Sequence, residues 1–453
     1  MAEPYQITAK DFILGESQSA YIADRGFSPT SYGLNLTKER GALYFKEAST
    51  DRGSTTLTGN LVAKGKDSDT ANDQYFVDDE AAFYTLLSAT FTKQFTGVNT
   101  YTLGTTDIKN FAGSGSELMY VSSQTAIAQC ALNFATVTEN WWTGLTSSYR
   151  HPLEEIEGEL FIADGNIIYF WNGTTSGTAF TLPAGKQVTT MRRHPDGKTL
   201  IAFATDKANY SHTAPSEGYA YFCDPSIRDW TREIKLESQV EGTRLVGGVL
   251  LCSYGTTIGY FNGDGLSFLK KQATSGTTYS QSMDNMDDIF LVRDGPYVLA
   301  FGDLGAGKVW WKMVGNVGLN NLNIVMHKGD SVILFAGTDG AGGGTLYEVD
   351  MKNSGSDGVF RTNQLNFGGE AKVKRIDLYH DATNTAGTTT IQLATLDDSG
   401  SLATIEDRVH VNQNVKFDRF DCDVKVQGTS QFFLNPQNDD IGYRVIRIYY
   451  DPV

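Results

Sequence analysis

The sequence predicts an all-β protein, in which a β-propeller of six or seven blades is followed by a small C-terminal β-sandwich. Composition is the first indication, because Gly accounts for 47 of the 453 residues and Pro for only 10, so Gly is enriched and Pro depleted relative to average proteins. Aromatic residues make up 12% and charged residues only 20%. Aromatic side chains favour strands, whereas long charged side chains favour helix surfaces. The second indication is a repeated pattern of strands and turns.

A pattern of three strands repeats over residues 113–350, in which an apolar strand, a Gly, Asp or Asn turn and a second apolar or aromatic strand are followed by a polar loop and a third strand. A degenerate copy begins near Tyr75. The clearest copies are 159–173 and 249–265, in which an aromatic pair precedes Asn-Gly, and a third copy covers 288–301. Copies recur roughly every 40 residues, which is the period of propeller blades. A small sheet of this kind cannot bury both faces alone and must pack against its neighbours. Counting copies from Tyr75 onward predicts the six or seven blades.

Three regions follow from this pattern: residues 1–72 form an N-terminal arm and first strands, 73–357 form the propeller, and 358–453 form the sandwich. The turn at 195–198, Pro-Asp-Gly-Lys, is similar to the hairpin turn of many propeller repeats. Polar residues 352–358 predict a linker. Beyond it, a strand about every ten residues is typical of a sandwich. The arm is expected to dock on another subunit or on the ring.

Charge and cysteine content exclude several classes of function. With 37 Lys and Arg against 53 Asp and Glu, the net charge of −16 excludes a basic nucleic-acid binder, and no tight nucleic-acid binding is expected. No apolar stretch approaches the length of a membrane span, and the N-terminus lacks the pattern of a secretory signal. Synthesis in the cytoplasm and no membrane insertion are therefore predicted. The four cysteines are far apart, which predicts reduced and buried thiols: Cys130, Cys223, Cys252 and Cys422.

No catalytic, cofactor-binding or metal-binding residue is predicted, and the chain is not expected to be an enzyme. Residues 302–309 have the GxxxxGK spacing of a phosphate loop, but Val309 replaces the required Ser or Thr, which favours a Gly-rich hairpin turn. The six histidines do not occur in pairs with metal-ligand spacing. Four acidic clusters are interpreted as solvated turns, although calcium binding is the alternative: Asp67, Asp69 and Asp73; Asp78, Asp79 and Glu80; Asp284, Asp287 and Asp288; Asp439 and Asp440.

Two Trp pairs, Trp141-Trp142 and Trp310-Trp311, are candidate platforms for stacking sugar rings. Paired Trp residues at a strand edge more often place one ring in the core and the other at an interface or a rim. The sequence box of sialidase-type propellers does not occur. A carbohydrate-binding propeller for host-cell adhesion is therefore the alternative function, followed by a glycan-active enzyme with carboxylates in a central pocket.

Residues at both ends of the chain carry a family resemblance. The pattern at 15–27, 32–36 and 41–44, together with 359–368 and 373–378, resembles propeller-bearing structural proteins of tailed bacteriophages, of the nozzle or hub type. The chain is shorter than the larger nozzle proteins. The resemblance implies a virion protein of the tail or tail tip that forms a homo-oligomeric ring, joins neighbouring tail proteins and can line the DNA path. An acidic surface there would let DNA slide without sticking.

Overall fold

The computed structural model describes residues 5–10, 31, 34–36, 43–45, 49–53, 56–66, 73–113, 115–206, 217–273, 277–304, 307–314, 322–337, 344–351, 360–361, 365–381, 387–395, 403–410, 416–437 and 442–453. These residues form an all-β protein, as predicted, and the helical content of the described part is the 3₁₀ turn η2 (Ser280–Ser282). Within the same part, no helix is long and apolar enough to cross a membrane. The chain divides into two compact units, one of residues 1–50, 296–318 and 349–453 and the other of residues 51–295 and 319–348.

Most of the strands belong to four-stranded sheets that are built from consecutive segments of the chain. In chain order, the first four sheets are β5 (Leu61–Lys66), β6 (Gln74–Asp78), β7 (Ala82–Leu87) and β8 (Thr90–Thr96); β9 (Ile108–Phe111), β10 (Leu118–Ser122), β11 (Ala126–Cys130) and β12 (Val137–Thr143); β13 (Leu153–Ile156), β14 (Glu159–Asp164), β15 (Ile167–Trp171) and β16 (Ser176–Thr181); and β17 (Gln187–Arg193), β18 (Leu200–Thr205), β19 (Gly218–Asp224) and β20 (Asp229–Leu236).

Three further four-stranded sheets follow, and the last of them takes a strand from the beginning of the chain. They are β21 (Gly242–Val246), β22 (Val249–Tyr254), β23 (Thr257–Phe261) and β24 (Leu266–Lys271); β25 (Met283–Met286), β26 (Ile289–Asp294), β27 (Tyr297–Asp303) and β28 (Lys308–Val314); and β29 (Leu322–Lys328), β30 (Ser331–Ala336), β31 (Thr345–Asp350) and β4 (Thr50–Asp51). The N-terminal strand β4 is held beside β31, where the Arg52 amide donates to the Leu346 carbonyl and the Arg52 guanidinium pairs with Glu348 at 2.7 Å.

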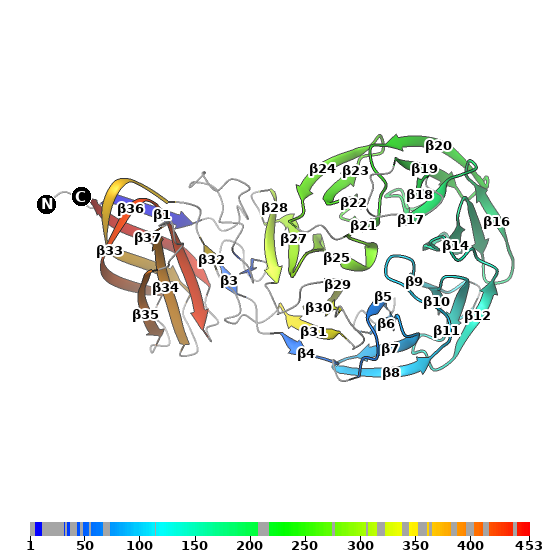
Figure 1. Cartoon of the computed structure of the whole chain (residues 1–453), viewed down its shortest axis with the longest axis horizontal. Helices are drawn as coiled ribbons and strands as arrows, with labels where there is room; N and C mark the ends of the chain where they lie inside the picture. The colour runs from blue at the N-terminus through cyan, green and yellow to red at the C-terminus, as the bar shows by residue number, and fades with distance from the viewer. Residues whose placement is uncertain are drawn as a thin grey trace. The chain divides into compact units, whose positions relative to one another are not determined.

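The first strands of these sheets lie around a common centre (Figure 1). Each contacts the next in the order β5, β9, β13, β17, β21, β25 and β29, and β29 contacts β5 in turn. The sheets are therefore arranged in a propeller-like manner. A twisted sheet has two faces to cover, and this arrangement lets neighbouring sheets cover them for each other.

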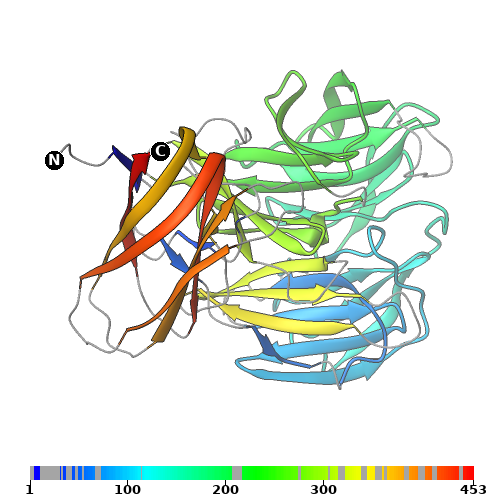
Figure 2. The same cartoon turned by 60° about the vertical axis from the view of Figure 1, so that its left-hand side comes forward.

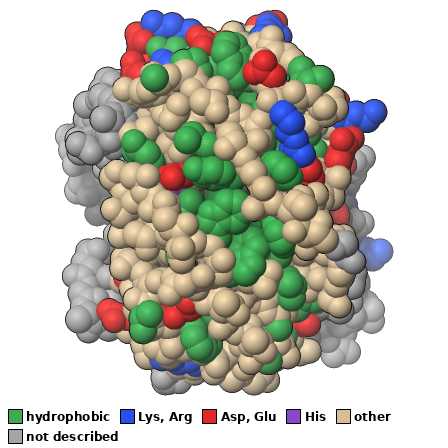
Figure 3. Space-filling view, turned by 90° about the vertical axis from the view of Figure 1, so that its right-hand side faces the viewer, with side chains coloured by type: hydrophobic (Ala, Val, Ile, Leu, Met, Phe, Trp, Pro, Cys, Tyr) green, Lys and Arg blue, Asp and Glu red, His purple; other side chains and the backbone are tan. Residues whose placement is uncertain are grey.

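Apolar side chains fill the spaces between neighbouring sheets. Phe161 and Ile168 of one sheet share a buried cluster with Leu200 and Tyr221 of the next. Between the sheets of β9–β12 and β13–β16, aromatic and aliphatic side chains pack together, and the packing reaches the outside because the rings of Trp141, Trp142 and Trp171 are only half-buried. Figure 3 views the side on which β12 and β16 lie, and it shows hydrophobic side chains gathered in the middle of that face.

The C-terminal strands form one seven-stranded sheet in the order β1 (Tyr5–Lys10), β37 (Tyr443–Pro452), β33 (Leu365–His380), β36 (Phe417–Gln437), β34 (Gly387–Thr395) and β35 (Ala403–His410), with β32 (Phe360–Arg361) beside β36. The short strands β2 (Leu34–Asn35) and β3 (Tyr44–Phe45) pair separately. Two register shifts interrupt the pairing of β33 with β36, and bulges of this kind bend strands. Figure 2 shows the resulting strong curvature of the long orange and red strands.

The strands and the cysteines give the outcome of several expectations from the sequence. The predicted boundary between residues 72 and 73 falls between β5 and β6, which pair in one sheet. The predicted linker at 352–358 and the whole of the N-terminal pattern at 15–27 lie outside the described residues. The N-terminal segment contributes β1, which pairs antiparallel with β37 over all six of its residues. The four cysteines are free thiols; three are buried, as predicted, and Cys422 is half-buried.

Candidate functional site

A polar cavity of about 340 Å³ lies among the first strands of the repeating sheets. It falls at the lower end of the size range of small-molecule sites. Every one of these strands contributes to its wall, so its residues come from distant parts of the sequence. The charged residues of the wall are Lys64, Lys66, Asp107, Lys109, Glu154, Glu155, Arg192, Arg193, Arg244 and Asp284.

Asp284 of β25 is the centre of one group of charges in this cavity. Its carboxylate is fully buried and lies 2.9 Å from the Lys66 ammonium, and it also pairs with the Arg244 guanidinium. The backbone amide of His327 donates to it at 2.8 Å. Burial opposes ionisation, but Arg244, Lys64 and Lys66 outweigh this cost and hold the pKa of Asp284 well below its usual range. Asp284 is therefore an anion enclosed by cations.

Lys64 belongs to the same group, and its side chain is 8% exposed. Its ammonium donates to the Met283 carbonyl at 2.5 Å and to the Val325 carbonyl, and it lies 3.9 Å from Asp284. Burial lowers the pKa of Lys64 to about 7, although Asp284 opposes this shift. The charge of Lys64 therefore changes near neutral pH, which is unusual for a lysine.

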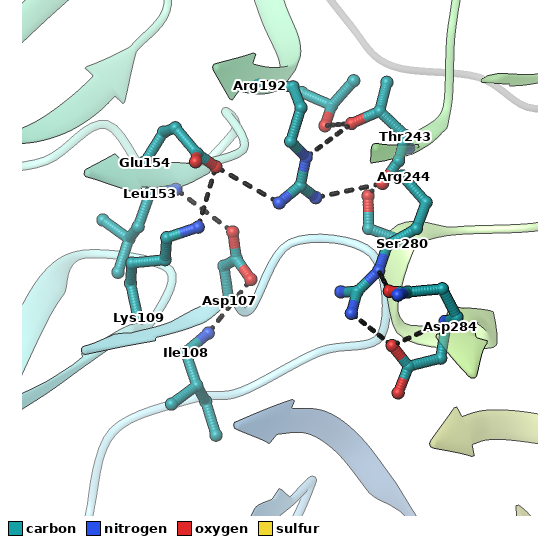
Figure 4. Close-up of polar contacts among 12 residues, drawn as sticks. Asp107, Ile108, Lys109, Leu153, Glu154, Arg192, Thr243, Arg244, Ser280 and Asp284 are labelled. Carbon is teal, nitrogen blue, oxygen red and sulfur yellow. Dashed lines mark hydrogen bonds and ion pairs between the residues drawn. The ribbon is translucent and has the colours of Figure 1, made fainter. Parts of the chain in front are cut away.

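Glu154 of β13 is the centre of a second group. Lys109 donates to its carboxylate at 2.8 Å and Arg192 donates at 3.2 Å (Figure 4). Burial opposes ionisation, but the two cations outweigh it and lower the pKa of Glu154. The Arg192 guanidinium also donates to the Thr243 carbonyl at 3.0 Å, which fixes it between β13 and β21.

Asp107, which precedes β9, differs from Glu154 and Asp284 in the direction in which its pKa is shifted. The backbone amides of Ile108 and Leu153 donate to its two oxygens at 3.1 and 3.2 Å. Burial nevertheless raises its pKa, and Lys109 and Arg192 counter the shift only in part. Asp107 therefore ionises less readily than an exposed aspartate does.

The cavity narrows toward the beginning of the first strands. An adjoining space of only about 20 Å³ shares Asp107, Ser280 and Gln281 with it and is also lined by Thr189 and Glu241. Beside this space, the buried Arg150 guanidinium pairs with the Glu241 carboxylate at 3.0 Å. The cavity is therefore wide at one end and nearly filled at the other.

Basic residues exceed acidic residues in the cavity wall, six against four. Glu154 and Asp284 each have at least two cationic partners, and the wall as a whole has two more basic than acidic residues. The side chains of Lys66 and Arg244 are 28% and 27% exposed, and Arg193 is exposed, so solvent reaches these groups. The arrangement can attract and hold a small anion.

Of the motif residues considered from the sequence, Asp284 lies in the cavity wall, and the others that the structure describes lie outside it. Within 302–309, Asp303 of β27 pairs with Lys308 of β28 in an antiparallel hairpin, as the hairpin interpretation predicted, and residues 305 and 306 lie outside the described residues. The interpretation of Asp284 as part of a solvated turn was wrong, because the side chain lies among cations in the cavity wall. Trp310 and Trp311 are buried, and Trp310 stacks on Phe301. Asp67, Asp69, Asp439 and Asp440 lie outside the described residues.

Histidines and metal ligands give no further site in the described part of the chain. His151 is buried between two backbone carbonyls, at 3.0 Å from Ala163 and 3.1 Å from Gln124. His380 pairs with Asp418 at 2.9 Å. No group of three or more His, Cys, Asp or Glu side chains among the described residues is arranged to hold a metal ion.

Apart from Asp284, the residues of the cavity wall belong to no motif that is recognisable in the sequence. They lie on first strands whose polar side chains carry no motif, and they are brought together only when the sheets assemble. The available signal was the occurrence of charged residues just before the apolar copies, such as Glu154 before 159–173 and Arg244 before 249–265.

Comparisons with known proteins give limited similarity. No protein-family model matches the chain, and no curated protein matches it. Among solved structures, the computationally designed Ika8 protein is similar over 66% of this chain and 99% of its own, with 8% identity and a TM-score of 0.43. The extracellular domain of the hybrid two-component system BT4673 from B. thetaiotaomicron is similar over 90% of this chain and 61% of its own, with 10% identity and a TM-score of 0.47.

Proposed function

We propose that this chain is a non-enzymatic structural protein of a tailed-bacteriophage virion, in which a seven-bladed β-propeller and a C-terminal β-sandwich serve as a tail or tail-tip part. It assembles as a homo-oligomeric ring and joins neighbouring tail proteins. The resemblance of residues 15–44 and 359–378 to nozzle and hub proteins motivates the proposal. The circular order of the first strands and the four-stranded sheets support the propeller part.

The observation that carries the structural role is the double anchoring of the N-terminal segment. Residues 5–10 add β1 to the C-terminal sheet, and residues 50–51 add β4 to the sheet of β29–β31. Each anchor joins segments from opposite ends of the chain, and such closure removes the frayed terminal element that open repeat proteins have. A part that transmits force between neighbours benefits from this construction.

The carboxyls of the cavity also favour a non-enzymatic role. A glycosidase needs two carboxyls that reach the sugar bond, one as an acid and the other as a base or nucleophile. Here Glu154 is held by Lys109 and Arg192, and Asp107 is held by two backbone amides. Among the described residues, the cavity wall contains no aromatic side chain on which a sugar could stack.

The mass of the protein tests the proposal. Light scattering of the purified full chain should give a multiple of its 49.6 kDa mass, and mass spectrometry of purified particles should detect the chain as a stoichiometric component. A monomer that is absent from particles would contradict the proposal. Electron microscopy of particles labelled with an antibody to the chain should place it at the tail.

A carbohydrate-binding role is a second candidate, and the half-buried aromatic group between the sheets of β9–β12 and β13–β16 favours it. Trp141 contacts Trp171 at a ring distance of 5.2 Å, and Trp142 contacts Tyr169 at 5.6 Å. The Trp171 indole N–H donates to the Tyr120 hydroxyl at 3.3 Å. Rings that are fixed by such contacts and remain partly exposed suit stacking on a sugar face.

A glycan array tests this second role. Binding by the wild-type chain that disappears in Trp142→Ala and Trp171→Ala would support it. Phe268→Ala is the matched control, because Phe268 is a 61% exposed aromatic residue on β24, outside the aromatic group. An array without signal above background would remove this candidate.

A further inference from the structure

We propose that the central cavity binds a small dianion of the phosphate monoester class. The inference concerns a ligand site and is independent of the structural role proposed above. It rests on the surplus of cations in the wall, on the donors that these cations leave unused, and on the size of the cavity.

The surplus of positive charge is that of the whole wall, which has six basic and four acidic residues, and two groups of charges show where cations outnumber their carboxylate. Glu154 is neutralised by one of its two partners, Lys109 and Arg192, which leaves one positive charge. Asp284 is neutralised by one of Lys66 and Arg244, which leaves a second. Two unbalanced cations that face one cavity match a ligand with two negative charges.

Unused donors provide the hydrogen bonds that such a ligand needs. An ammonium has three N–H donors and a guanidinium has five. Within the described residues, Lys66 and Lys109 each use one donor on a carboxylate, and Arg244 donates to Asp284 and Asn285. The remaining N–H groups have no protein acceptor there. A tetrahedral oxyanion, whose several oxygens each accept hydrogen bonds, suits donors that approach from different strands.

Size and access limit the ligand further. The cavity of about 340 Å³ holds a molecule such as a sugar phosphate and not a polymer. Arg193 is exposed at the end of β17, next to Arg192, and provides a cation at the entrance. Because the adjoining space is only about 20 Å³, the ligand enters and leaves from the same wide end.

Isothermal titration calorimetry of the full chain tests the inference with sodium sulfate, sodium phosphate, glucose 6-phosphate and glucose 6-sulfate as probes. We expect binding of one dianion per chain that weakens with added salt. The double variant K66Q/K109Q leaves each buried carboxylate with an arginine partner, and it should bind at least about tenfold more weakly. Glucose 6-phosphate should bind more tightly than glucose 6-sulfate, which carries only one negative charge. Equal binding of the two esters would contradict the match to two negative charges.

Two further variants keep the test decisive. Lys235→Gln is the matched control, because Lys235 pairs with Glu217 at 2.8 Å while both side chains are more than half exposed, away from the cavity wall. It should bind the probes as the wild type does. Arg193→Gln changes an exposed residue of the cavity wall, so the variant should fold. It should bind the probes more weakly than the wild type, and it therefore provides a test if K66Q/K109Q does not fold. No binding of any probe, or equal weakening by Lys235→Gln, would overturn the inference.

Discussion

The Lys66 ammonium lies 2.9 Å from the carboxylate of Asp284, and this ion pair joins β5 to β25 across the polar cavity. Replacing Asp284 with Asn removes the anion and leaves the cations around it without their partner. Loss of one partner of a buried ion pair costs about 3–5 kcal/mol. The free energy of unfolding, measured by urea titration, should fall by that amount.

The control for this prediction is Asp264→Asn. Asp264 pairs with Arg232, but its side chain is 81% exposed and that of Arg232 is 52% exposed. Exposed pairs contribute about 0–1 kcal/mol, so this change should have little effect. Equal losses in the two variants would show that burial does not govern the Asp284 pair.

Sulfate binding should weaken as the pH rises through about 7, because Lys64 loses its proton there. Its pKa is lowered to about 7, mainly by burial and also by Arg244, Lys66 and Arg192, whereas Asp284 opposes the shift. Sulfate keeps its charge across this range, so the change reports on the protein. Calorimetric titrations at several pH values measure it. In Lys64→Met, sulfate should bind more weakly than to the wild type, and its affinity should no longer fall as the pH rises through about 7. If the affinity of the variant still falls in this range, another group is responsible for the pH dependence.

The C-terminal sheet should lose stability as the pH rises from mildly acidic values. His380 is buried, and burial lowers its pKa. The hydrogen bond to Asp418 at 2.9 Å, the hydrogen bond to the Asp381 carbonyl and the charges of both carboxylates together outweigh burial and raise the pKa above 6.5. A group with a higher pKa in the folded chain stabilises the fold below its unfolded pKa, and this contribution disappears as the pH passes through the folded pKa. Differential scanning calorimetry from acidic to neutral pH measures the loss. His380→Gln should abolish this part of the pH dependence, and a wild-type profile in the variant would contradict the assignment.

Deletion of residues 1–10 should destabilise the C-terminal sheet and promote self-association. β1 covers the edge of β37 by pairing from Tyr5 with Tyr450 to Lys10 with Val445. Without it, the backbone groups of β37 become an open edge, which favours pairing with another chain. Calorimetry should show a lower transition temperature, and light scattering should show a larger mass. A deletion variant with the wild-type transition and mass would show that β1 is dispensable.

Much of the fold is predictable because apolar and turn residues repeat. The copies at 159–173 and 249–265 became β14–β15 and β22–β23, and Gly165 has the positive φ of 65° that its tight turn requires. The sequence pattern indicated three strands in each copy, whereas the sheets have four. The missed strand is the first, such as β21, because it lines a polar cavity and lacks an apolar run.

The cavity itself was not predictable from spacing. Arg192 and Glu154 pair at 3.2 Å, but they meet only because β13 and β17 are neighbours in the assembled unit. Asp284 was grouped with Asp287 and Asp288 because they are close in sequence, yet its partners Lys66 and Arg244 come from other sheets. Contacts between sheets decide the environment of a charged residue, and local sequence does not contain them.

The pairing of β4 with β31 constrains the order of events during synthesis on the ribosome. β4 contains residues 50–51, whereas β31 contains residues 345–350. The strand that completes this sheet therefore emerges early and must wait until nearly all the repeats have been translated. Contacts between such distant segments slow folding and leave strand edges open in the meantime. A nascent chain that stalls before β31 will expose an unfinished sheet, and it becomes a target for chaperones or for pairing with another unfinished copy.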